Sequence, residues 1–455
     1  MSSFKKLLMS SAGGAEGDYY ATWSENDTSF YGGSAVPDGA ETYLFDRGYA
    51  NISGTNRDGL QNLVYADDGS IPTYPFYYGQ SADIEVQFFM NDNNNAVMLG
   101  SDIYATSNAY RLASPAYDGA CFSKFTGTSH QFSKVVSQSG YGDQINFSAI
   151  GTDGTDLYCA GTENKTTGNS AAWLVSFDTS GTINWQKAIS TTGLNFESPQ
   201  AVRVDSSGNL IVMWLNRYNG IGGRDFYIAK FNSSGTVQWQ KYYGTTQQDY
   251  PINMWLDSSD NIYLIFGYVN AFANVAKLNS SGTVQWSKMW RYHNVVLNVY
   301  DGATDPDGNT YVVGRNYATR GSGARVQNFR IKIDSTGSLE FAEEWYNSAT
   351  STYGFDGTAV NEFGSNLCWS VNTPKDASGY DTLMAKLPPD VQTNTFGNIT
   401  CYDETSGWDA SESNLTLSTS TPTYTWATPS GLGVQRTLNL TSGNHTIGYS
   451  TDIIT

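Results

Sequence analysis

The sequence predicts an all-β protein built as a β-propeller, and three observations support this prediction. The stretch AKFNSSGTVQWQK at residues 229–241 recurs almost unchanged as AKLNSSGTVQWSK at 276–288. Each copy places two alternating apolar runs around a short Gly-containing loop, which is the pattern of a β-hairpin. An Asp or Asn turn followed by a β-rich run precedes each copy. One unit therefore holds about four strands in about 50 residues, the size of a propeller blade.

The hairpin turn supplies the register of the repeat. Asn232, Ser233, Ser234 and Gly235 are residues that form turns at low cost, and Gly allows a positive φ. Weaker copies occur at 173–187 (WLVSFDTSGTINWQK) and 330–341 (RIKIDSTGSLEF). A more degenerate copy at 122–134 has Phe132 where later copies have Trp185, Trp239 and Trp286. Because these aromatic residues hold the same place in each unit, we expect them to pack neighbouring blades together rather than to bind sugar.

The repeat divides the chain into three regions. Residues 1–90 are interpreted as an N-terminal attachment region, with a contribution to a blade as the alternative; residues 91–389 form the propeller, and residues 390–455 form a Ser/Thr-rich C-terminal β segment. Six repeats are recognisable, and a seventh blade would come from residues before 91, residues after 390, or both. The C-terminal segment would close the ring or pair between chains, because exposed strand edges need a partner.

Composition excludes several classes of function. Only 15% of the 455 residues are charged while 14% are aromatic, which fits an ordered β protein. The net charge is −18 with no basic cluster, so nucleic acid is not expected as a partner. No stretch approaches the roughly 20 apolar residues of a membrane span. The start, MSSFKKLLMSSAGG, has too short an apolar core for a secretory signal, and we interpret it as a segment that docks onto a partner.

Two resemblances follow from these motifs. The unit DSSGN…AKFNSSGTVQWQK resembles the SBBP-type repeat of seven-bladed β-propellers, over about residues 91–389. The opening SSFKKLLMSSAGG and the Thr/Ser-rich tail after LPPD resemble the ends of tail-fibre-like virion proteins of marine bacteriophages. Together these resemblances imply a structural protein of the virion, located in the particle after assembly in the host cytoplasm. They imply no enzyme activity.

No catalytic, cofactor or metal site is predicted. The DPDGN turn at 305–309 is the best calcium candidate, but it lacks the Glu at position 12 of an EF-hand loop, and strand-capping Asx turns explain it without a metal. The three histidines are far apart and show no metal-binding spacing. Glu343 and Glu344 are neighbours on a strand and point to opposite faces, so they do not form one acid/base site. Carboxylates brought together from different blades remain a possible glycosidase pair.

Function is therefore expected in the loops and chain ends. The candidate ligand contacts are aromatic residues between repeat strands: Tyr218, Tyr250, Trp290 and Tyr292. The expected partners are other virion proteins through the N-terminal segment, a host-surface glycan or protein, and further copies of the chain. The favoured hypothesis is a non-enzymatic tail fibre or appendage protein. The alternatives are a capsid-surface decoration protein and a carbohydrate-active propeller enzyme, which would bring two or more carboxylates with raised pKa values to one face of the ring.

Overall fold

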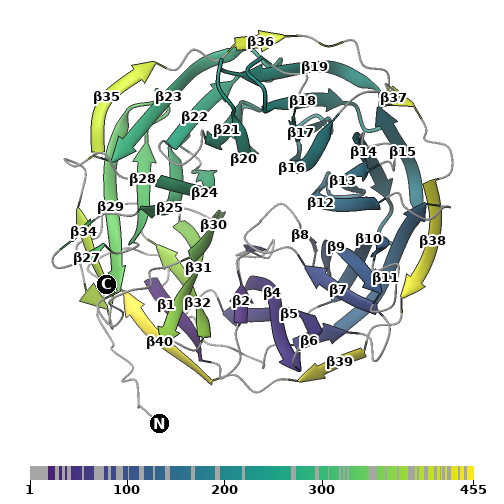
Figure 1. Ribbon diagram of the computed structural model, residues 1–455, viewed down its shortest axis with the longest axis horizontal. Coiled ribbons are helices and arrows are strands. Elements are labelled where there is room, and N and C mark those ends of the chain that lie inside the picture. Colours follow the sequence, from purple (N-terminus) through teal and green to yellow (C-terminus); the bar gives the residue numbers. More distant parts are fainter. Residues whose placement is uncertain are drawn as a thin grey trace.

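The computed structural model describes the strands named below, between Tyr19 and Ile454, and most of the turns and loops between residues 144 and 347. Side chains are described mainly within residues 96–345. In this part of the chain the strands form seven sheets of five or six strands, arranged as blades around a central axis (Figure 1). The predicted all-β propeller is confirmed, with seven blades. Among the described residues no helix is long and apolar enough to cross a bilayer.

Four consecutive blades come from the clear repeats, and each uses its strands from the axis outward in chain order. Blade 3 holds β12 (Gln144–Thr152), β13 (Leu157–Asn164), β14 (Ser170–Phe177) and β15 (Ile183–Ile189). Blade 4 holds β16 (Phe196–Val204), β17 (Leu210–Asn216), β18 (Asp225–Phe231) and β19 (Val237–Gly244). Blade 5 holds β20 (Tyr250–Leu256), β21 (Ile262–Gly267), β22 (Ala273–Leu278) and β23 (Val284–Tyr292). Blade 6 holds β24 (Leu297–Thr304), β25 (Thr310–Asn316), β28 (Gln327–Ile333) and β29 (Leu339–Asn347). A separate two-stranded ribbon, β26 (Thr319–Arg320) with β27 (Gly323–Ala324), lies between β25 and β28 in sequence.

The other three blades are less regular. Blade 1 contains β2 (Phe30–Gly32), β3 (Val36–Pro37), β4 (Tyr43–Ser53), β5 (Asn56–Tyr65) and β6 (Phe76–Gly79). Blade 2 contains β7 (Ile84–Phe88), β8 (Ala96–Leu99), β9 (Asp102–Arg111), β10 (Tyr117–Thr126) and β11 (Ser129–Gln138). Blade 7 joins both chain ends, because β30 (Asp356–Phe363), β31 (Asn366–Asp376) and β32 (Gly379–Leu387) are followed in the sheet by β1 (Tyr19–Glu25). Strands from both sides of the central repeats thus complete the ring.

The C-terminal segment runs around the outside of the ring and adds a strand to every blade (Figure 1). We call these strands the belt. They follow the blades in reverse order, from blade 6 through blades 5, 4, 3, 2 and 1 to blade 7: β33 (Thr395–Phe396) with β34 (Ile399–Asp403), β35 (Trp408–Asn414), β36 (Ser418–Ser420), β37 (Trp426–Ala427), β38 (Leu432–Leu438), β39 (Thr441–Asn444) and β40 (Gly448–Ile454). An outer strand satisfies edge backbone groups that would otherwise be open to another chain. Pairing between copies of the chain remains a prediction.

The antiparallel order gives the ring two different ends. At the turn face, short turns join the first strand of a blade to the second and the third to the fourth, as at 205–209 and 232–236 in blade 4. At the loop face, longer segments join the second strand to the third and one blade to the next, as around 221–224 and 245–249. Both ends of the described chain lie at the turn face, because Tyr20 is paired with Lys386 near the end of β32 and Tyr19 with Ile454.

The core lies between blades. One buried cluster joins blades 3 and 4 through residues such as Trp214, Tyr227 and Phe196. Another joins blades 4 and 5 through Phe226, Phe266 and Met254. Trp290 and Phe329 belong to a third cluster, between blades 5 and 6. Where side chains are described, from blade 3 to blade 6, the sheet faces are therefore covered by the neighbouring blades, which leaves the innermost strands and the two ends of the ring as the places where a ligand can approach.

Candidate functional site

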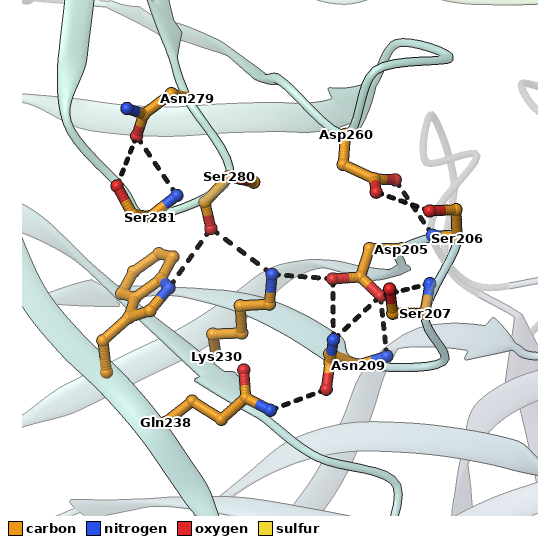
Figure 2. A network of polar contacts seen from close by, with 11 residues as sticks. Asp205, Ser206, Ser207, Asn209, Lys230, Gln238, Asp260, Asn279, Ser280 and Ser281 are labelled. Atoms are coloured by element: carbon orange, nitrogen blue, oxygen red, sulfur yellow. Dashed lines mark hydrogen bonds and ion pairs between the residues drawn. The ribbon is translucent and has the colours of Figure 1, made fainter.

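The turns of the repeat are a structural network that links neighbouring blades at the turn face (Figure 2). Asp205 Oδ1 accepts hydrogen bonds from the backbone N–H of Ser207 (2.9 Å) and Asn209 (2.8 Å), so the predicted Asx turn is present. Lys230 Nζ lies 2.6 Å from Asp205 Oδ2, with only 9% and 2% of the two side chains exposed. The same ammonium donates to the carbonyl of Ser280 in blade 5 at 3.3 Å. These bonds account for the carboxylate of Asp205 without a ligand.

The electrostatics of this turn agree with a structural role. Burial by itself raises the pKa of Asp205, but hydrogen bonds from Lys230 and Asn209 outweigh it, and the pKa is lowered overall. The pKa of Asp257, at the equivalent place in blade 5, is lowered in the same way by hydrogen bonds from Asn261 and the turn backbone. Asp305 also accepts from the backbone N–H of its own turn, at Asn309 (2.8 Å). The carboxylates are used to hold the turns.

The repeated aromatic residues join each blade to the next. Trp185, Trp239 and Trp286 donate through Nε1 to the carbonyls of Ser233 (3.0 Å), Ser280 (3.4 Å) and Ser335 (3.4 Å) of the following blade. A Cβ added to the turn glycine of that blade would meet the indole ring at 3.0–3.1 Å, and Gly181 meets Phe132 in the same manner. The packing interpretation is confirmed. Trp239 is half-buried rather than fully buried.

The innermost strands carry the residues that differ most between blades. Each of these strands in blades 3 to 6 has a register shift near its middle, and the unpaired bulge residues are Ser148, Gln200, Ile252 and Tyr300. All four are half-buried, as are the residues two places earlier: Asn146, Ser198, Tyr250 and Asn298. β-bulges re-aim side chains and are common next to functional sites. We call these eight residues the axial residues, since their strands border the axis (Figure 1).

Tyr250 is held at the loop-face end of blade 5 by an arginine from blade 4. Arg224 donates through one terminal nitrogen to Tyr250 Oη (2.6 Å) and through the other to Glu197 Oε1 (3.1 Å). Its guanidinium also lies 5.2 Å from the centroid of the Tyr250 ring. Tyr250 Oη in turn donates to Gln248 (3.0 Å), and Arg217 lies 3.4 Å from Glu197. The phenol is therefore fixed in orientation by groups from three loops and strands.

Tyr300 forms a second pair with an arginine, in blade 6. The guanidinium of Arg315 lies 5.6 Å from the centroid of the Tyr300 ring. With the Asn298 amide oriented to satisfy its neighbours, its oxygen accepts from Arg315 Nε (3.0 Å) and a terminal nitrogen (3.1 Å). Arg–aromatic contacts of this kind are worth roughly 0.5–1 kcal/mol at exposed sites and more when desolvated. Adjacent blades thus each carry, on the innermost strand, one tyrosine that is contacted by an arginine.

Two buried carboxylates, Asp225 and Asp249, are the sequence neighbours of Arg224 and Tyr250, the two residues joined by the hydrogen bond described above. Asp225 accepts from the backbone N–H of Ile221 and Gly222 (2.8 Å), and its other oxygen has no hydrogen-bond partner. Asp249 accepts from the backbone N–H (2.6 Å) and hydroxyl (2.8 Å) of Thr245. Burial raises the pKa of both groups, and the charge of Asp249 raises that of Asp225 further. Perturbed carboxylates of this kind are typical of functional sites, although here both also fix loop backbone.

The structure separates the four aromatic residues that the sequence singled out. Tyr250 takes part in the arrangement just described. Trp290 has no exposed surface and belongs to the core between blades 5 and 6, so the prediction that it contacts a ligand is wrong for this structure. Its side chain lies on the face of blade 5 that blade 6 covers. Tyr218 and the side chain of Tyr292 lie outside the described residues.

Sequence reasoning missed most of the axial residues and both arginines. A signal was available in the spacing of the bulge residues, which lie 52, 52 and 48 positions apart and are Ser, Gln, Ile and Tyr in turn. Aligning the repeats on the aspartates of their first turns (Asp153, Asp205, Asp257 and Asp305), each five residues after a bulge residue, would have revealed these positions as ones that vary in chemistry. Glu343 and Glu344 behave as predicted: Glu343 pairs with Arg330 (2.7 Å), whereas Glu344 accepts from Asn316 (2.5 Å).

Comparison with known proteins gives likeness in fold only. No family model and no curated protein matches the chain. A protein of unknown function from Dyadobacter fermentans matches 81% of this chain and 98% of its own, with 12% identity and a TM-score of 0.46. The polysaccharide lyase Uly1 matches 81% of this chain and 99% of its own, with 8% identity and a TM-score of 0.45. The endosialidase of phage phi92 matches 83% and 71%, with 11% identity and a TM-score of 0.43.

One expectation from the sequence is corrected by this comparison. The sequence led us to expect a protein without enzyme activity, because no catalytic motif was visible in the repeats. Several of the matching structures are named as enzymes, among them the lyase, the endosialidase and a sialidase from Trypanosoma rangeli. The absence of a motif in the repeats is no ground for excluding catalysis, because function depends on the residues of a site and not on the fold that carries it.

Proposed function

We propose that the chain is a component of a phage virion, similar to a tail fibre or appendage, that attaches to the particle through its N-terminal end and recognises a host-surface glycan or protein through its loop face. The observation that supports this proposal is that the N-terminal strand and the divergent loops lie at opposite ends of the ring. The N-terminal strand begins at the turn face, where Tyr19 pairs with Ile454. The divergent loops and the ordered Arg224–Tyr250 group lie at the opposite end. A particle bound at the turn face would present these loops outward.

The belt is consistent with a protein that must stay folded outside a cell. Each blade receives an outer strand from the same chain, so the sheet edges have a partner within the molecule. Blade 7 combines β1 and β40, whose seven paired positions join the two chain ends. Opening the ring requires separation of strands that are distant in sequence, and such a topology opposes unfolding from either terminus.

A deletion experiment tests the attachment part of the proposal. Removing residues 2–18 leaves β1 intact and should give a protein that folds but no longer joins particles. Particles assembled with the full chain or the deletion would be purified and probed for the protein, with circular dichroism of the free deletion as the folding control. Normal incorporation of the folded deletion would show that attachment does not use this segment.

Two further candidate functions have distinct tests. A capsid-surface decoration protein would occupy the head of the particle, so locating the protein in a map of the virion separates it from a tail appendage. The buried pair Asp225 and Asp249, with raised pKa values at the loop face, favours a carbohydrate-active enzyme as the second candidate. Hydrolysis or elimination assays on the glycans that bind the purified protein would detect such an activity, and Asp225→Asn should then abolish it.

A further inference from the structure

We propose that the axial residues form a binding site for an uncharged oligosaccharide, in which Tyr250 and Tyr300 are the rings against which sugar units stack. This inference deepens the proposed function, since it names the class of ligand that the loop-face end of the ring would take. It concerns the purified protein and does not depend on where in a particle the protein sits.

The two tyrosines are ordered before any ligand arrives. Arg224 fixes the hydroxyl of Tyr250 at 2.6 Å and lies over its ring. Arg315 lies over the ring of Tyr300, while Asn298 holds the guanidinium at 3.0 and 3.1 Å. Both rings belong to innermost strands of adjacent blades and both are half-buried. An aromatic side chain with a fixed orientation offers a flat apolar surface at little cost in conformational entropy, which suits the C–H face of a pyranose.

The neighbouring axial residues supply neutral polar groups. Asn146, Ser198, Gln200 and Asn298 are half-buried on the same four strands. Gln200 Nε2 donates to Ser198 Oγ (2.6 Å), so these two side chains are positioned with respect to each other. Hydroxyl and amide groups both donate and accept, as sugar hydroxyls do. Sugar recognition by such residues needs no formal charge on the ligand.

Electrostatics favour an uncharged ligand over an acidic one. Arg224 is engaged by Glu197 and Tyr250, and Arg315 is engaged by Asn298. Neither guanidinium therefore offers its two-pronged donor set to a ligand carboxylate without first giving up these partners. The chain also has a net charge of −18, which opposes the approach of a polyanion at low ionic strength. Both arginines are thus used to orient tyrosine side chains and not to bind an acidic ligand.

The test uses the full-length protein and isothermal titration with two sets of hexasaccharides. One set is neutral, built from glucose, galactose, mannose or N-acetylglucosamine, and the other is acidic, built from uronic or sialic acid. We expect binding within the neutral set, with little change in affinity between 50 and 500 mM NaCl. Binding only to acidic oligosaccharides, or to none of the neutral ones, would overturn the proposal.

Substitutions locate the site. Tyr250→Ala and Tyr300→Ala should each weaken binding of the same neutral oligosaccharide about tenfold or more through loss of the stacking surface. Tyr250→Phe keeps the ring and should retain binding within about threefold, although it loses the bond from Arg224. Gln238→Ala, an exposed change at the turn face, is the matched control and should have no effect. Unchanged affinity in a folded Tyr250→Ala, Tyr300→Ala double variant would disprove the assignment.

Discussion

The turn face and the loop face of this propeller differ in how closely one blade resembles the next. At the turn face, Asp205, Asp257 and Asp305 hold equivalent turns, and the indoles of successive blades pack on equivalent glycines. In the loop-face half of the innermost strands, equivalent positions differ between blades and hold Asn146, Ser198, Tyr250 and Asn298. Residues that repeat from blade to blade therefore form the contacts that hold the ring together. Residues that differ between blades are the ones available to bind a ligand.

The largest expected effect is at a buried ion pair of the turn face. Asp205→Ala removes the acceptor of two backbone N–H groups and leaves Lys230 buried without its carboxylate. We expect the free energy of unfolding to fall by about 3–5 kcal/mol, as for other broken buried pairs. Urea denaturation would measure this change. A loss below about 1 kcal/mol would mean that the network at the turn face contributes little to stability.

The next effect concerns the contact between blades. Trp239→Ala removes a half-buried indole that packs on the Gly282 turn and donates to Ser280. Full burial would predict a cost of about 3–5 kcal/mol, and partial exposure lowers our expectation to about 2 kcal/mol. Trp286→Ala, at the same place in the next blade, should cost a similar amount. Very different losses in the free energy of unfolding for the two variants, measured by the same denaturation, would show that the contacts between successive blades are not equivalent.

A pair of glycines separates backbone strain from packing. Gly235 (φ 78°) and Gly208 (φ 77°) both adopt the left-handed conformation, which costs a non-Gly residue about 1–2 kcal/mol. A Cβ at Gly235 would also meet Trp185 at 3.0 Å, whereas one at Gly208 would meet nothing within 4 Å. Gly235→Ala should therefore destabilise the protein more than Gly208→Ala. Equal decreases in melting temperature for the two variants would show that the Trp185 indole moves aside at no cost in stability.

The smallest effect is on the pH dependence of stability, which should have opposite signs at the two faces. The pKa of Asp205 is lowered in the folded state, so its contribution is present above its unfolded pKa and is lost as the pH falls through the folded pKa. The pKa of Asp249 is raised by burial, so its ionisation destabilises the folded state at neutral pH. Asp249→Asn, which retains an acceptor for Thr245, should leave stability at pH 7 unchanged or slightly higher. Asp205→Asn should lower stability at pH 7 and flatten its decline below about pH 4. Denaturation midpoints between pH 3 and 7 would measure both changes, and a common sign for the two variants would contradict the comparison.

Several features could be predicted because they depend on residues close together in sequence. The Asn232–Gly235 turn, the Asp205 turn and the strand alternation around Trp239 follow from local geometry, and their recurrence gave the propeller. The inter-blade role of the indoles also followed, because an aromatic at a fixed place in every unit needs the same neighbour each time. The burial of Trp290 was not predicted because the residues that cover it belong to blade 6 and are distant in sequence.

The sequence by itself determined the blade, since a hairpin with a fixed glycine and alternating apolar residues specifies a sheet of fixed register. Only the tertiary structure decided how the ring is completed: β1 enters blade 7, and the belt supplies an outer strand to all seven blades. It also decided the candidate site, because Arg224, Glu197 and Tyr250 converge from segments tens of residues apart. The physical reason is that strand pairing within a blade is local, whereas ring closure and side-chain convergence depend on which edges and loops the curvature of the ring brings together.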